Sequence, residues 1–157
     1  MAVVTSHVYP YAQSLINAGS INLTSATAGA FKMGLCTSAA ATWGATQWAY
    51  QFVSSITGAY TEVSTGGYAR VSLASLAVGT GTTAQYEKWT CTSPISFGST
   101  ITLAAASGFI YTTLVGSADA SYPVVAIIDF GQTVTSTAGN WTYTIDPTYG
   151  LASWESI

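Results

Sequence analysis

Most catalytic arrangements that this chain could form would have to include its single histidine. His7 is the only histidine among the 157 residues. A Ser–His–acid triad would have to use it, and so would a Cys–His pair built on Cys36 or Cys91. The Gly-x-Ser-x-Gly turn that carries the nucleophile of many hydrolases does not occur in the sequence. Because His7 falls in what reads as a flexible terminus, we expect no catalytic residue and no enzyme.

Paired carboxylates offer the other route to chemistry. Asp129 ends one apolar stretch and Asp146 follows another, which would bring both to one end of a sheet. Glycosidases use such pairs. Aspartates at strand ends more commonly accept backbone hydrogen bonds in turns, and we expect that role for both. The Asp-x-Asp-x-Asp spacing of calcium loops is missing from the sequence, so no metal ligand is expected.

Two glycine-rich pieces resemble phosphate-binding loops only superficially. Gly66-Gly67 and the Gly-Thr-Gly at residues 79–81 lack a following lysine and the strand-to-helix context of such loops. Both are typical of hairpin turns, and we expect no cofactor.

Charged residues are scarce. Three Lys or Arg and six Asp or Glu make up 6% of the chain, against about 25% in an average soluble domain. Nucleic-acid binding takes on the order of six phosphate contacts, which three scattered cations cannot supply. An anionic membrane surface is disfavoured for the same reason. The apolar stretches are shorter than the ~18 residues of a spanning helix, and the first seven residues do not resemble a secretory signal. We therefore expect neither nucleic acid nor membrane as a partner.

Aromatic residues make up 13% of the chain, with ten Tyr and five Trp. Such side chains fill β cores, but they are also favoured at protein interfaces and can stack on sugars. The predicted core aromatics are Trp89, Trp141 and Phe130. The predicted contact residues, in or beside an Ala/Thr-rich loop, are Trp43, Trp48 and Tyr50.

The two cysteines, Cys36 and Cys91, leave three alternatives open: one disulfide, two buried thiols, or a pair kept reduced in the cytosol. Two small buried hydrophobic side chains are favoured among these.

Hydrophobic periodicity predicts a mainly β chain. A short helix is predicted over residues 8–18, stopped by Gly19, and a second over residues 47–56 in an insertion. Between them the period changes to two, with Phe31, Met33 and Leu35 on one face. The predicted strands are residues 31–36, 68–76, 86–91, 95–103 (two short pieces or an edge, after Pro94), 109–114, 124–130 and 141–145.

Strands that recur every 10–20 residues with Gly, Ser, Thr or Asn turns between them indicate an antiparallel β-sandwich or barrel-like domain. No internal repeat or linker divides the sequence. We therefore predict one domain over residues 1–157, with the N-terminal helix and link at 1–25 and the β core at 26–157.

Four motifs follow the predicted N-terminal helix in a fixed order. The first two are residues 31–37 (FKMGLCT) and residues 62–70 (EVSTGGYAR). Residues 127–131 (IIDFG) and 140–146 (NWTYTID) follow near the end of the chain, with a turn at residues 136–139 between them. In this order the motifs resemble a family of tailed-bacteriophage virion proteins of the head decoration or minor capsid type. The chain departs from the family pattern at residues 39–56, where the family is more acidic and this chain is rich in Ala, Thr and Trp.

The resemblance implies a small β-sandwich-like virion component with no catalytic residues. From it we expect a capsid decoration (cement) protein that is made in the bacterial host cytoplasm and located on the capsid exterior. Its expected partners are the major capsid protein and further copies of itself, with a trimer favoured. Two other functions share the composition: a tail or fibre component, and a carbohydrate-binding module that uses exposed Trp and Tyr.

Overall fold

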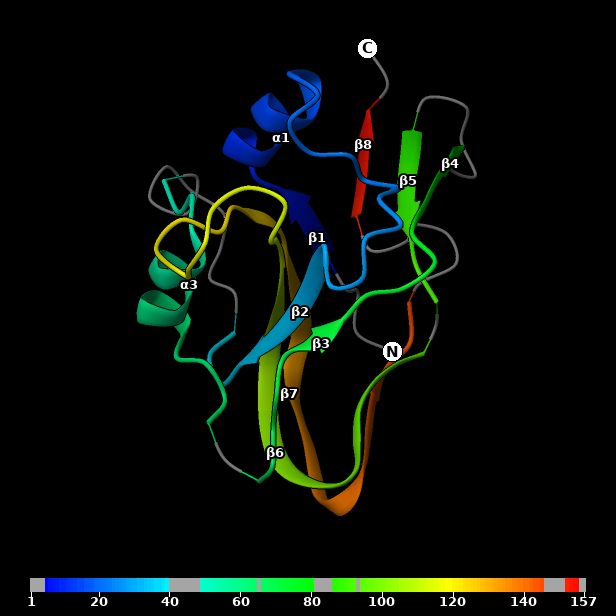
Figure 1. Ribbon diagram of the computed structural model, residues 1–157. Helices are drawn as coiled ribbons and strands as arrows, with labels where there is room; N and C mark the ends of the chain where they lie inside the picture. Colours follow the sequence, from blue (N-terminus) through cyan, green and yellow to red (C-terminus); the bar gives the residue numbers. More distant parts are fainter. Residues whose placement is uncertain are drawn as a thin grey trace.

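The computed structural model describes residues 5–39, 49–64, 66–80, 86–92, 94–145 and 152–155, with the backbone alone for residues 5–7, 80, 86, 87 and 152–155. Two antiparallel sheets dominate these residues (Figure 1), one with the strand order β1-β7-β6-β2-β3 and one with the order β4-β5-β8. The strands are β1 (Thr5–Val8), β2 (Phe31–Cys36), β3 (Val71–Ser72), β4 (Ala77–Thr80), β5 (Tyr86–Thr90), β6 (Ile95–Thr112), β7 (Val124–Tyr143) and β8 (Ala152–Glu155). The predicted mainly β, antiparallel architecture is confirmed.

The predicted N-terminal helix is confirmed as α1 (Pro10–Asn17). Pro10 occupies the first turn, where its missing N–H would have no intrahelical partner in any case. At the other end, Gly19 adopts a φ of +72°, and its N–H donates to the Ile16 carbonyl. A left-handed glycine of this kind ends a helix without the steric cost that a Cβ atom would bring.

Strand β1, which precedes α1, was not predicted from the sequence. Its backbone pairs with β7, with His7 opposite Ile127. The prediction of a flexible terminus around His7 is therefore wrong. Pairing with a central, buried strand orders the backbone of this short polar segment despite its weak hydrophobic pattern.

The second helix, α3 (Val53–Tyr60), lies further along the chain than predicted. Thr57 and Gly58, which lie just beyond the predicted helix, are inside α3. Its buried residues Val53, Ile56 and Tyr60 follow helical spacing, and they place one face against the core.

Two long strands, β6 and β7, replace four of the predicted ones. The segment at 95–103 was expected to be two short pieces or an edge, but it continues into 109–112 as one strand of 18 residues. Pro94 precedes the strand and does not interrupt it. Similarly, the turn expected at residues 136–139 lies within the 20-residue strand β7. The expected break within residues 95–103 and the expected turn at residues 136–139 are therefore wrong. The alternative of an edge holds for residues 95–103, which pair with β7 alone among the described strands.

The chain bends inside these strands instead of leaving the sheet. The register between β6 and β7 shifts at five places, and β-bulges of this kind bend a strand pair strongly. Gly98 and Gly131 take positive φ values of 138° and 67° near the bend. Figure 1 shows both strands curving together at the lower end of the view, where β7 is orange.

The core lies between the first sheet and the elements that cover it. Strand β2 is buried nearly throughout, with Phe31, Met33 and Leu35 at 0% exposure, as their alternation predicts. Burying a side chain such as Phe31 contributes roughly 2–3 kcal/mol to stability. On the other face of β2, Gly34 lies opposite Phe109 of β6, and a Cβ at Gly34 would overlap the Phe109 ring.

The second sheet joins this core through Trp89 of β5. Its ring packs edge-on against Phe31, with 4.9 Å between centroids, and its Nε1 donates to the Leu23 carbonyl at 2.9 Å. Phe130 and Trp141 are also buried and contact one another. The three aromatic residues predicted for the core are therefore confirmed.

Neither helix of the described residues is long and apolar enough to cross a membrane.

Candidate functional site

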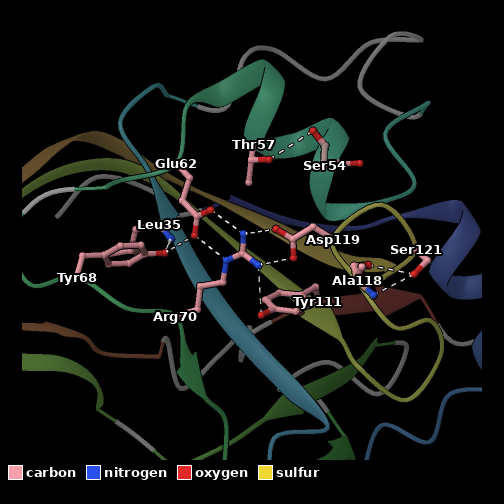
Figure 2. A network of polar contacts seen from close by, with 10 residues as sticks. All are labelled: Leu35, Ser54, Thr57, Glu62, Tyr68, Arg70, Tyr111, Ala118, Asp119 and Ser121. Carbon is pink, nitrogen blue, oxygen red and sulfur yellow. Dashed lines mark hydrogen bonds and ion pairs between the residues drawn. The ribbon is translucent and has the colours of Figure 1, made fainter.

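Three of the nine charged residues meet in one polar cluster on the face of the first sheet (Figure 2). Arg70 lies just before β3, Glu62 follows α3, and Asp119 belongs to the loop at residues 113–123 that connects β6 to β7. We call Glu62, Arg70 and Asp119 the Arg70 clasp. It joins parts of the chain that are 49 residues apart in sequence.

Every N–H group of the Arg70 guanidinium has an acceptor. Nε donates to Glu62 Oε1 and Nη2 to Glu62 Oε2, both at 2.7 Å. On the other side, Nη1 and Nη2 donate to Asp119 Oδ1 and Oδ2, again at 2.7 Å. The remaining Nη1 hydrogen faces Tyr111 Oη at 3.5 Å. The two bidentate pairs use four of the five donors of the arginine and Tyr111 takes the fifth, an arrangement that a lysine could not reproduce.

Aromatic rings lie under the guanidinium. The Arg70 Cζ atom lies 5.5 Å from the centroid of Phe109 and 5.2 Å from that of Tyr111. These two rings are neighbours on the same face of β6 and stack at 5.9 Å. A cation over such rings is attracted by their π electrons. The guanidinium is therefore stabilised by the aromatic rings on one face as well as by the hydrogen bonds in its plane.

Tyr68 ties the clasp to strand β2. The backbone N–H of Leu35 donates to Tyr68 Oη at 2.8 Å, and the hydroxyl donates to Glu62 Oε1 at 3.0 Å. The Tyr68 ring also stacks on Phe97 of β6 at 6.1 Å. Burial raises the pKa of Tyr68 well above its ordinary value, which keeps the hydroxyl a proton donor toward Glu62.

The clasp is partly shielded from solvent. The side chains of Arg70 and Glu62 are 20% and 21% exposed, and that of Asp119 is 45% exposed. The hydrogen bonds from Arg70 hold the pKa of Asp119 below its ordinary value. The same contacts, led by the one with Glu62, raise the pKa of Arg70. Asp119 and Arg70 are therefore both charged near neutral pH.

This arrangement has the properties of a structural fastening and lacks those of a reaction centre. A catalytic or anion-binding arginine needs free donors, and those of Arg70 are all used within the chain. In the described part of the chain, no three His, Cys, Asp or Glu residues come together as a metal site would need.

Glu62 and Arg70 both lie in the motif at residues 62–70, but the sequence did not predict their contact or the clasp. The usable signal was the scarcity of charge, because a half-buried arginine in such a chain needs an acidic partner. Nothing local indicates that Asp119 is that partner. The loop at residues 113–123 reaches Arg70 only through the fold.

Of the two carboxylates considered as a pair and expected to accept backbone hydrogen bonds, Asp146 lies outside the described residues. Asp129 lies within β7, and its Oδ1 accepts the N–H of Gly131 at 2.9 Å. That is the backbone-bonding role expected for it, although it lies inside a long strand and not at a strand end.

The three predicted contact residues have different outcomes. Trp43 and Trp48 lie outside the described residues. Tyr50 is half-buried, and its ring packs edge-on against Tyr60 of α3 at 6.0 Å. The part of Tyr50 left at the surface is therefore small.

The cysteines are two separate thiols. Cys36 is buried in β2 and Cys91 is half-buried after β5, and both are free. Burial raises the pKa of Cys36 to about 12 and that of Cys91 to about 11. Both are therefore protonated near neutral pH, consistent with small apolar side chains and not with reactive thiolates.

A comparison with known protein families, curated proteins and solved structures found no match to this chain.

Proposed function

We propose that this protein is a bacteriophage capsid decoration (cement) protein that binds the outside of the major capsid shell and stabilises it. Four motifs in family order, spread over residues 31–146, support the proposal. The observation that carries it furthest is an uncharged, exposed arm formed by residues 131–140 of β7.

The arm consists of Gly131 to Asn140 and runs along the bent part of β7 (Figure 1). Eight of its ten residues are exposed, and Ser136 and Gly139 are half-buried. From residue 130 to residue 145 the sequence has no charged residue. Val134, 36% exposed, is one of two large apolar side chains at the described surface. A protein usually keeps charge on such a surface to remain unassociated, so an uncharged arm favours contact with a neighbour.

The bend is held firmly enough to present the arm in one shape. Ser136 Oγ donates to the Ile101 carbonyl at 2.9 Å, and the Ala138 N–H donates to Thr102 Oγ1 at the same distance. A pre-organised surface loses less conformational entropy when it binds.

In this role the protein would act by mass action. A subunit that binds only the assembled shell, across neighbouring capsomers, lowers the free energy of that state and leaves free capsid protein unaffected. Repeated contacts on a symmetric shell suit a homo-oligomer, and we propose a trimer.

Co-sedimentation with shells that lack the protein tests the proposal. The shells would be assembled from the major capsid protein of the phage that encodes this chain. We expect saturable binding by the wild type and at least about tenfold weaker binding by Val134→Lys, because a charge placed in a contact must be desolvated. The matched control is Gln13→Lys, which adds the same charge on the exposed face of α1. Lack of wild-type binding, with a monomer in light scattering, would contradict the proposal.

A tail or fibre component would share these features and differ only in its place on the particle. A carbohydrate-binding module receives less support, since the two tryptophans with described side chains, Trp89 and Trp141, are 0% and 4% exposed. Saturable quenching of tryptophan fluorescence by a sugar would favour the module over the capsid protein.

A further inference from the structure

The loop at residues 113–123 joins helix α3 to the sheet through backbone hydrogen bonds. The Ser54 N–H donates to the Asp119 carbonyl at 3.0 Å, and the Val53 N–H donates to the Tyr122 carbonyl at 3.1 Å. Both donors lie in the first turn of α3, where N–H groups have no partner within the helix. The N-cap residue, Phe52, provides no side-chain hydrogen bond. The loop therefore takes the place of a capping residue.

The end of the loop and the first residue of β7 bind the residues that directly precede α3. The Val124 N–H donates to the Gln51 carbonyl at 3.0 Å, and Phe52 forms an isolated antiparallel bridge with Pro123. In Figure 1 the yellow loop lies beside α3. Residues 51–54 thus depend on the position of the loop.

Few buried side chains fix the loop itself. Residues 116–118 are exposed, and Leu114 and Val115 are only half-buried. Within the loop, Ser121 Oγ accepts hydrogen bonds from the N–H groups of Ser117 and Ala118 and donates one to the Ala118 carbonyl. The two ends of the loop are attached elsewhere: Thr113 donates to the carbonyls of Gly29 and Ala30, and the Tyr122 ring packs against Tyr111. Between these ends, the strong side-chain attachment is the pair of 2.7 Å bonds from Arg70 to the Asp119 carboxylate. Charge-assisted bidentate bonds of this kind combine strength with a fixed geometry.

We propose that the loop at residues 113–123 is a latch on α3, closed by the contact between Asp119 and Arg70. When that contact is lost, the loop and the start of α3 open together while the two sheets remain folded. Segments with few buried contacts can open in this way as local cooperative units. The opening exposes Val53 and Ile56, so the closed state dominates.

Native-state amide hydrogen exchange tests the latch in the isolated protein. In Asp119→Asn we expect the amides of Val53 and Ser54 to exchange about tenfold faster or more, because a charge-assisted bond to Arg70 is weakened. The backbone carbonyl of residue 119, which accepts from the Ser54 N–H, is still present in this variant. Faster exchange of Ser54 would therefore show that the loop is no longer held in position. The amides of Tyr9 and Leu73, which bond to Val125 and Phe31 in the sheet, should keep their rates.

The matched control is Asp129→Asn. It removes the same charge from a carboxylate that accepts only from Gly131 among the bonds described for it, and it should leave Val53 and Ser54 unchanged. Arg70→Lys keeps the positive charge but cannot bind two carboxylates through paired donors, so it should reproduce the Asp119→Asn pattern.

Equal acceleration at Tyr9 and Leu73, or no acceleration anywhere, would overturn the latch. If a variant does not fold, hydrogen exchange of the wild type at increasing denaturant concentrations tests the latch instead. We expect the exchange rates of the α3 amides to depend less on denaturant than that of Leu73, because a local opening exposes less surface. Equal dependence would contradict the proposal.

If the proposed function holds, the latch also affects binding to capsid shells. Helix α3 begins shortly after Trp48, a predicted contact residue, and we expect an open latch to weaken that binding. If exchange shows the latch but shells do not bind, the proposed function fails and the latch remains.

Discussion

Arg70 shows how a scarce residue type is used when a chain has few charges. One guanidinium satisfies two carboxylates from distant segments and rests on two aromatic rings. Because its donors are all occupied, it fastens the fold and does not bind an anion from solution. The sequence indicated that Asp129 would accept a backbone hydrogen bond, which is confirmed. It could not indicate the clasp, because the spacing between Arg70 and Asp119 has no local regularity.

The clasp predicts a specific loss of stability in acid. The pKa of Asp119 is lower in the folded protein than its ordinary value of 3.8, because of Arg70. The unfolded chain therefore binds the proton more readily than the folded protein. The free energy of unfolding falls as the pH drops from above 3.8 through the lower pKa of the folded state. The charged and titratable groups that face Asp119 are Arg70, Glu62 and Tyr111.

Urea unfolding from about pH 5 to pH 2 measures this effect. We expect the wild type to be more stable than Asp119→Asn near pH 5, and the difference between them to shrink as the pH falls. The effect should be small, since Asp119 is 45% exposed. A difference that stays constant across the range would contradict a charged contact between Asp119 and Arg70.

Among the elements, the strands with the clearest alternation were the ones predicted well. Strand β2 has the predicted bounds, whereas the long β6 and β7 were each predicted as separate shorter strands. Gly, Ser and Asn are typical of turns, but bulges can hold the same residues within a bent strand. Local composition does not distinguish the two cases, because the hydrogen-bonding partner strand decides between them.

The pairing of β2 with β6 depends on the missing side chain at Gly34. Its φ is not in the left-handed region, so a substitution there is opposed by space alone. We expect Gly34→Ala to destabilise the protein by about 1–3 kcal/mol, because the fully buried Phe109 ring must move. Urea unfolding would measure the change.

Gly58 provides the matched control. It lies inside α3 with open space around a Cβ, so Gly58→Ala should stabilise the protein by up to about 1 kcal/mol. Equal effects of the two substitutions would show that the contact between Gly34 and Phe109 does not limit the packing of these strands.

At the scale of the whole molecule, the few charged residues are distributed unevenly. Three of the charged residues join the segments of the fold in the Arg70 clasp. The exposed arm of β7 has none. Hydrophobic periodicity and the spacing of the turns were enough to predict an antiparallel β fold, which is confirmed. They could not predict the uncharged arm, because its exposure depends on the bend shared by β6 and β7.

Cryo-electron microscopy of the intact particle tests the central proposal most directly. We expect density that fits this chain on the outer surface of the shell, at symmetry-related positions, with residues 131–140 of β7 against the major capsid protein or a second copy. Density for the chain only on the tail, or a complete particle without it, would contradict a capsid decoration protein.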